Sequence, residues 1–267
     1  MDHLRRELAP LSQAAWSAIE QESANTLKEI LAARKLVDFR GPLGWEASSV
    51  DLGRVQRLQQ PPRAGVEARL RKVLPMVELR APFTLSRDEL EALDRGAPDV
   101  DLQPAVEAAR AAALAEDQAV FYGLGEAGIT GIAQAAPQTL PLTDDYLRYP
   151  DTVAQALEKL RTAGIAGPYA IALGPRCYTG LTQTRDAGYP VIEHVRRLLD
   201  GPIVWAPAAD GALVLSLRGG DFELVVGQDF SIGYLDHDDR QIRLYLEETC
   251  TFHVNTPEAA VVLRYSG

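Results

Sequence analysis

A glycine cluster is the first pattern in this chain that could do chemistry. Gly123, Gly125 and Gly128 match GxGxxG. In a dinucleotide site, this loop lies between a strand and a helix, so that the helix N-terminus faces the pyrophosphate. Here the pattern follows a long helical segment and precedes a proline-bearing stretch. We therefore interpret it as a cluster that ends a helix.

Acidic residues could bind a hard cation or act as general acids and bases. Four consecutive residues, Asp236–Asp239, rarely converge on one ion, and their strand-like flanks favour a solvated hairpin turn. Glu247 and Glu248 are neighbours on a predicted strand and should point to opposite faces. Asp221 and Asp229 flank another strand, where turn or cap roles are favoured. We predict no catalytic residue.

The histidine spacing, the net charge and the hydropathy pattern argue against several further classes of function. The histidines lack metal-ligand spacing, and there is neither a GxSxG elbow nor a P-loop, so we predict no metal site. A net charge of −10 argues against nucleic-acid binding. The few lysines form no membrane-binding basic patch, and no run of 18 apolar residues predicts a transmembrane helix. Cys177 and Cys250 form no CxxC pair and suit packing roles in a reducing cytoplasm, where we expect the protein to lie.

Two helices dominate the expected elements. Ser12 can cap a helix with apolar residues at helical spacing, which Asn25 could break. Asp101–Tyr122 is rich in alanine and predicts a long spine helix. Between them, segments 51–59 and 76–85 alternate apolar and polar residues, which predicts two strands joined by a long, arginine-rich excursion. That excursion is either a solvated hairpin or an arm that lies on a neighbouring subunit.

The middle of the chain alternates helix and strand patterns and predicts a compact α+β unit. Within it, Ala133–Asp145 carries prolines and glutamines and is the best candidate for a flexible connection. Strands are expected again in Arg218–Val254. The elements thus indicate an α+β protein with long helices, a protruding segment and a second unit.

Blocks along nearly the whole chain, in the right order, resemble encapsulins, which are bacterial shell proteins related to the capsid proteins of tailed phages. Among them are LAPLSQAAWSAIE, AARKLVDFRGPLGW, LPMVELRAPFTL, GYPVIEHVRRLLDG and RGGDFELVVGQDFSIGY. The resemblance implies an α+β, HK97 phage capsid-like fold with a peripheral domain, an axial domain and an extended loop. The expected divisions are 1–49 (N-terminal helix and start of the peripheral domain), 50–84 (extended loop), 85–126 (peripheral domain with the spine helix), 127–224 (axial domain) and 225–267 (peripheral domain, C-terminal strands).

The resemblance also implies a function. The chain would assemble with itself, in about 60 copies, into a hollow icosahedral cage. Because Val50–Arg71 contains neither lysine nor asparagine, the Lys–Asn crosslinks of some phage relatives cannot form there. A cargo enzyme, such as a dye-decolourising peroxidase or a ferritin-like protein, would enter through its C-terminal targeting peptide. Any iron storage or response to oxidative stress would then belong to the cargo.

Site residues carry over from the family by position. The groove for the cargo peptide would be formed by Leu27, Ile30, Leu31, Arg34, Asp38, Asp229, Phe230 and Ile232. The five-fold pore loop would be formed by Thr182, Gln183, Thr184, Arg185, Asp186, Ala187, Gly188 and Tyr189. Some members stack a flavin on a tryptophan, but Asp88 stands at that position here. We therefore predict no flavin and no other cofactor.

Two alternatives stay open. A phage or prophage major capsid protein would share the fold, although the −10 charge argues against packaging DNA. A hydrolase of the bacteriocin or protease kind would have to rely on Glu247–Glu248 and Asp236–Asp239, which form no recognised catalytic pattern.

Overall fold

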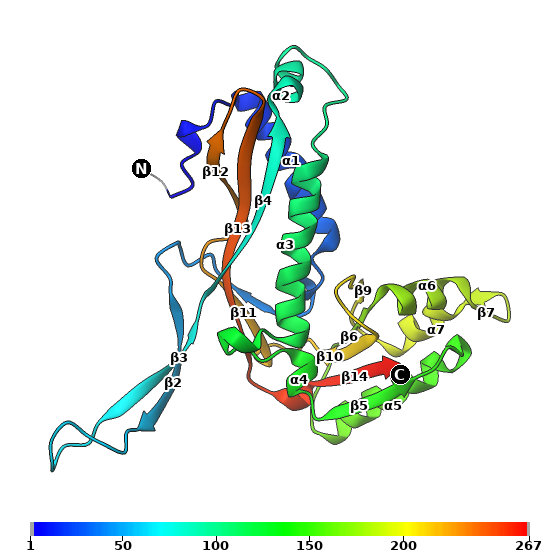
Figure 1. The fold of residues 1–267 in the computed structure, drawn as a ribbon. Coiled ribbons are helices and arrows are strands. Elements are labelled where there is room, and N and C mark those ends of the chain that lie inside the picture. Colours follow the sequence, from blue (N-terminus) through cyan, green and yellow to red (C-terminus); the bar gives the residue numbers. More distant parts are fainter. Residues whose placement is uncertain (1–2, 266–267) are drawn as a thin grey trace.

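The structure is a computed structural model that describes residues 3–265 (Figure 1). A long upright body carries a hairpin arm on one side and a second unit at its foot. The α-helices are α1 (Gln13–Ile30), α2 (Arg87–Asp94), α3 (Gln103–Tyr122), α4 (Ile132–Ala135), α5 (Tyr149–Thr162), α6 (Pro175–Gln183) and α7 (Val191–Leu198). The strands are β1 (Asp38–Arg40), β2 (Ser49–Arg57), β3 (Arg69–Pro75), β4 (Val77–Ser86), β5 (Gln138–Leu142), β6 (Tyr169–Leu173), β7 (Arg185–Asp186), β8 (Tyr189–Pro190), β9 (Ile203–Trp205), β10 (Ala212–Ser216), β11 (Phe222–Val226), β12 (Ser231–His237), β13 (Gln241–Val254) and β14 (Ala260–Tyr265).

The body is built on the long strand β13, which pairs antiparallel with β4, β11 and β12. The register with β4 runs from Gln241 opposite Ser86 to Cys250 opposite Val77. The spine helix α3 packs on β4 and β13, and α1 packs on α3. Small alanines of α3, such as Ala109 and Ala113, are fully buried there and let the two helices approach closely. The expected spine helix is confirmed, with its start at Gln103.

The N-terminal helix is continuous. Ser12 caps it as predicted, because its hydroxyl oxygen accepts from the Ala15 amide at 3.0 Å. The predicted break at Asn25 is wrong, because α1 continues to Ile30. The Asn25 side chain is exposed and accepts from Gln21 Nε2 at 2.8 Å, so it does not compete with the helix backbone.

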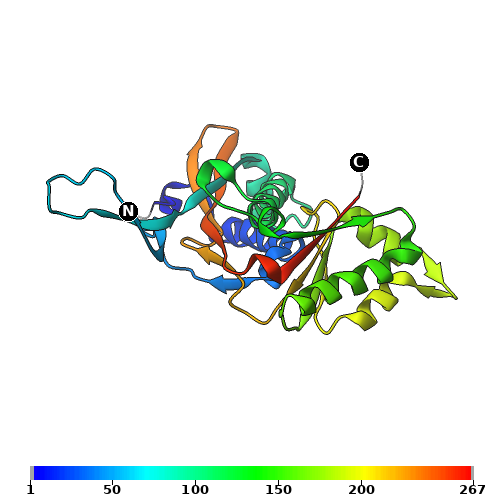
Figure 2. The same ribbon diagram turned by 90° about the horizontal axis from the view of Figure 1, so that it is seen from below.

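The second unit is a sheet in the order β5-β14-β10-β6-β9, covered by α5, α6 and α7 (Figure 2). Ala133–Asp145, predicted to be a flexible connection, instead contains α4 and β5. Leu140 and Leu142 are buried in the core, and β5 lies at an edge of the sheet, where Pro141 is tolerated. The last strand, β14, also belongs to this sheet, although 225–267 was expected to stay with the first one.

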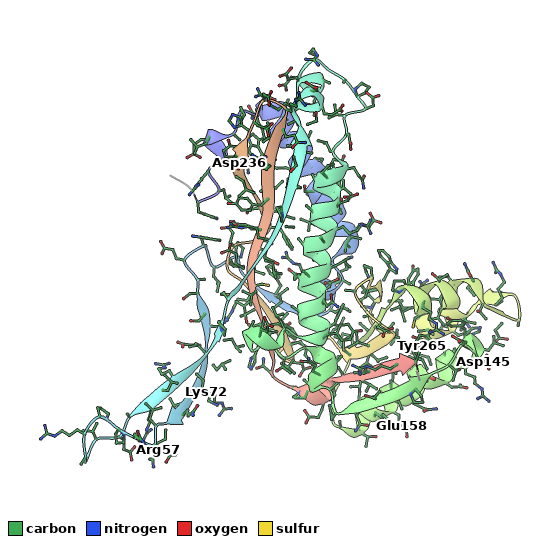
Figure 3. The ribbon with its side chains drawn as sticks, viewed as in Figure 1. Arg57, Lys72, Asp145, Glu158, Asp236 and Tyr265 are labelled. Carbon is green, nitrogen blue, oxygen red and sulfur yellow. The ribbon has the colours of Figure 1, made fainter. Side chains whose placement is uncertain are left out.

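The arm is an antiparallel hairpin of β2 and β3 that protrudes from the body (Figure 1). Both predicted strands are confirmed, as β2 and β4, but the excursion between them also contains a strand. The arginine-rich segment itself forms β3, which pairs with β2, whereas 77–86 forms β4 in the main sheet. Arg57 and Lys72, labelled on the arm in Figure 3, both lie outside the body.

The glycine pattern ends a helix, as predicted. Gly123 follows α3 with φ +83°, and a Cβ there would lie 2.7 Å from the Gly131 nitrogen. The element directly before it is the helix α3 and not a strand, so it lacks the context of a dinucleotide loop. Within residues 3–265, no helix is both long and apolar enough to cross a membrane. Cys177 and Cys250 are free and buried.

Replacing the cap of α1 is expected to loosen the N-terminal helix. In Ser12→Ala, the Ala15 amide loses its acceptor and Asp94 loses the Ser12 hydroxyl, so stability should fall by about 1 kcal/mol. Urea unfolding followed by tryptophan fluorescence would show a lower midpoint. Ser17→Ala, on an exposed position inside α1, is the control and should not lower it. Equal midpoints for the two variants would contradict the capping role.

Candidate functional site

A pocket of about 410 Å³ lies where the end of α1 meets the connection between β11 and β12. Residues of α1 that face it are three or four positions apart, so they share one side of the helix. The pocket is lined by Ala24, Leu27, Lys28, Leu31, Arg34, Lys35, Asp229 and Phe230. Apolar side chains thus form its floor and charged side chains its rim.

Arg34 forms one wall of the pocket and is held by three carboxylates. Its Nη2 donates to Glu116 at 2.6 Å and to Glu248 at 2.5 Å, and its Nη1 lies 3.0 Å from Asp229. The side chains of Glu116 and Glu248 are fully buried. Burial by itself lowers the pKa of Arg34, but the hydrogen bond and charge of Glu116, with Glu248 and Asp229, raise it overall.

Aromatic rings complete the surroundings of Arg34. Its guanidinium lies 4.9 Å from the centroid of Phe230 and 5.0 Å from that of Phe39. Such contacts hold the flat guanidinium group in one orientation. Arg34 is therefore a fixed, already paired part of the pocket wall.

Asp117, next to Glu116 on α3, joins the spine to the end of the N-terminal helix. Its two oxygens accept from the backbone amides of Ala32 (2.9 Å) and Ala33 (2.8 Å), at the start of the 3-10 turn Ala33–Lys35. Burial raises the pKa of Asp117 to about 7, although the hydrogen bonds from the two amides favour the ionised form and lower it. Burial and the nearby charge of Glu116 likewise raise the pKa of Glu248.

The structure brings together five of the eight residues expected to form the groove, namely Leu27, Leu31, Arg34, Asp229 and Phe230. Ile30 and Ile232 lie in the core behind it. Asp38 lies on β1, where its carboxylate accepts from the Gly220 amide at 2.5 Å and lines a smaller pocket of about 190 Å³.

Sequence reasoning missed several residues of the site. Ala24 and Lys28 share the helix face of Leu27, so helical periodicity could have found them. Glu116 and Glu248 come from α3 and β13, far from Arg34 in the chain, and no local pattern marks them as its partners.

The eight residues expected to form a pore loop lie together at one tip of the second unit. Thr182 and Gln183 end α6, and β7 and β8 form a two-residue hairpin. Ala187 (φ +47°) and Gly188 (φ +91°) make its turn, a geometry in which both central residues have positive φ. Arg185 donates to the Gly188 carbonyl at 3.2 Å, and Tyr189 is well exposed.

The acidic clusters play structural roles. Asp238 accepts from the amides of Arg240 and Gln241, both at 2.9 Å, which confirms the hairpin turn between β12 and β13. Asp221 pairs with Arg218 at 2.8 Å at the start of β11. Glu247 and Glu248 meet different partners on the two faces of β13, as expected. Within the described residues, no group of His, Cys, Asp and Glu could hold a metal ion.

Solved structures place the fold among capsid-forming proteins. A virus-like particle from Pyrococcus furiosus superimposes with a TM-score of 0.66 at 18% identity, covering 93% of this chain and 98% of that one. The capsid of the myovirus XM1 superimposes with a TM-score of 0.56 at 11% identity, covering 88% and 91%. The HK97 phage capsid-like fold is thereby confirmed.

Sequence relatives narrow this class to one family. The family described as encapsulating protein for peroxidase matches residues 1–251. The type 1 encapsulin shell protein of Rhodospirillum rubrum is 54% identical, covering 99% of this chain and 97% of its own. That of Mycobacterium tuberculosis is 47% identical, covering 99% and 100%. The chain belongs to the type 1 encapsulin shell proteins, whose subunits build a capsid-like cage.

The raised pKa of Asp117 makes a prediction about pH. Because the folded protein binds this proton more tightly than the unfolded chain, the contribution of Asp117 to stability is fully present below pH 3.8. It is lost as the pH rises towards about 7. The unfolding free energy of wild type should therefore fall over this window more than that of Asp117→Asn, as measured by denaturant titrations at several pH values. Asp239→Asn, on an exposed turn, should retain the wild-type slope. Parallel pH profiles for wild type and Asp117→Asn would contradict this assignment.

Proposed function

We propose that this cage encloses a cargo enzyme in the cytoplasm, captures it through a short C-terminal peptide bound in the α1 pocket, and admits small solutes near the loop Thr182–Tyr189. The observation that carries the proposal is the pocket itself. It has an apolar floor and a charged rim, and it lies in a subunit whose relatives are shell proteins. An extended peptide can fill such a groove with alternate apolar side chains.

The chemistry of the pocket favours a particular kind of peptide. Leu27 and Leu31 offer apolar contacts, while Lys28 and Lys35 at the rim can meet a backbone carbonyl or a carboxylate. Since Arg34 is already paired with three carboxylates, its role is to shape the wall. Apolar side chains of the peptide therefore supply most of the affinity.

The cargo is inferred to be a redox enzyme. The family is described as encapsulating protein for peroxidase. A relative from Kuenenia stuttgartiensis, 25% identical, is a fusion of a diheme cytochrome with an encapsulin shell protein. A dye-decolourising peroxidase or a ferritin-like protein fits this description. Iron storage or protection from oxidative stress would then be the work of the cargo.

Assembly is proposed to depend on the arm. Val55 and Leu70 are 54% and 57% exposed, unusually high for large apolar residues on paired strands. Val55 lies opposite Arg71, and Leu70 lies opposite Gln56, so Val55 and Leu70 point to opposite faces of the hairpin. Both faces of the arm thus offer apolar surface to neighbouring subunits, in a shell of about 60 copies.

The pore proposal relies on the position of the β7–β8 tip. It is the outermost part of the second unit in Figures 1 and 2, and Arg185, Asp186 and Tyr189 are exposed on it. Around a symmetry axis, copies of this tip would form a ring whose charge is set by Arg185 and Asp186.

Adding charge to the arm is expected to block assembly. Val55→Glu and, separately, Leu70→Glu would place a carboxylate in an apolar contact and should convert cages into small oligomers, because burying an unpaired charge is costly. Size-exclusion chromatography and negative-stain microscopy would measure this. Asn25→Glu, which adds the same charge at an exposed position of α1 outside the arm, is the control and should still form cages. Normal cages from both apolar variants would exclude this role for the arm.

Changing the pocket is expected to reduce cargo without affecting the cage. Ala24→Glu introduces a carboxylate into the pocket, whereas Asn25→Glu introduces the same group on the adjacent exposed position of α1. Native cages should be purified and their co-purifying proteins identified and quantified by mass spectrometry. Cargo per cage should fall at least about tenfold in Ala24→Glu, as expected for burying a charge in an apolar contact, and stay constant in Asn25→Glu. Equal loading of the two variants would rule out this pocket.

A further inference from the structure

The arm joins the body through two connections that lie side by side. The chain enters the arm through residues 41–48, which include Trp45, and leaves it through Met76 into β4, which carries Arg80. The Met76 amide donates to the Ser48 carbonyl at 2.9 Å. Figure 2 shows the N-terminal segment, in dark blue, beside this root of the arm.

His3 contacts the entering connection directly. Its ring stacks on the indole of Trp45, with the ring centroids 3.9 Å apart and 10° between the planes. Backbone bonds from Leu43 and Gly44 to the end of β11 hold the start of this connection. Trp45 is the next residue. Its stack with His3 therefore holds the part of the connection that leads into the arm.

His3 contacts the leaving connection through Glu247. Its Nε2 lies 2.8 Å from Glu247 Oε1, and Glu247 Oε2 accepts from Arg80 Nη2 at 2.7 Å. The Glu247 side chain is fully buried, and its two oxygens face the N-terminal segment and β4 respectively.

The N-terminal segment is itself fixed on the main sheet. The Leu4 carbonyl accepts from the Tyr234 amide of β12 at 2.8 Å, and the Leu4 side chain is buried. The Tyr245 hydroxyl of β13 reaches the His3 carbonyl at 3.5 Å, and its ring lies 4.2 Å from the Arg80 guanidinium. His3 is therefore held by β12 and β13 while it stacks on the entering connection and is linked through Glu247 to β4, the strand that leaves the arm.

We propose that His3 and Leu4 form a clamp that fixes the direction of the arm relative to the main sheet, and that shells of a single diameter depend on this clamp. Beyond its root, a two-stranded hairpin with both faces exposed gets little support from the body, so the root sets its direction. A tilt at the root moves the tip relative to the neighbouring subunit and changes the curvature at which contacts close. This inference rests on the proposed role of the arm in assembly.

The test uses full-length His3→Ala and Trp45→Ala, which remove the stack from either side. Hydrogen–deuterium exchange on purified particles should show about tenfold faster exchange at residues 45–48 and 76–80, the effect of losing roughly one charge-assisted or stacking contact. Cryo-electron microscopy should show shells of more than one diameter. His253→Ala is the control: this partly exposed residue of β13 lies opposite Glu223 of β11, away from the clamp, and the variant should behave as wild type.

Wild-type exchange at the root, or a single wild-type diameter, in both His3→Ala and Trp45→Ala would overturn the clamp. These results also separate failure of the clamp from failure of the proposed role of the arm in assembly. If the arm has no such role, the Val55→Glu and Leu70→Glu proteins would still form cages. If only the clamp is wrong, those two variants would fail to assemble while His3→Ala and Trp45→Ala behave as wild type.

Discussion

The ion cluster around Arg34 is the interaction on which the rest of this subunit depends. Arg34 follows α1, Glu116 lies on the spine helix and Glu248 on the central strand β13. Two buried carboxylates without their cation would cost several kcal/mol, so these three elements have one favourable arrangement. Asp117 adds two backbone bonds to the same joint. The end of α1, and with it the pocket, is positioned by buried charge in addition to apolar packing.

Glu247, the neighbour of Glu248 on β13, connects a second set of elements on the opposite face of the strand. Because successive strand residues point to opposite sides, Glu248 serves the joint with α1, while Glu247 serves the joint with Arg80 and His3. Two adjacent acids thus link the N-terminal helix, the N-terminal segment and the strand that leaves the arm. Residues that would suggest catalysis in another setting here connect the parts of a shell subunit.

Much of the fold was predictable, because it follows from local patterns and from the order of family blocks. Ser12, the alanines of the spine and the helix-ending Gly123 act through their own segments, and each was predicted correctly. Asn25, β5 and β3 were predicted wrongly. The helix around Asn25 is stabilised by packing against α3, and β5 and β3 exist because β14 and β2 pair with them. The intrinsic helix or strand propensity of a segment depends only on its own residues, so it does not reveal a partner that is distant in the chain.

The sequence by itself determined the class of protein, the long helices and the absence of any recognised catalytic pattern, since these depend on composition, periodicity and block order. Only the tertiary structure decided which residues meet. It separated Ile30, Ile232 and Asp38 from the pocket, added Ala24, Lys28 and Lys35, and paired Arg34 with acids more than 80 positions away. The reason is physical: a buried charge needs a partner in space, and its position in the chain does not specify which element will bring that partner.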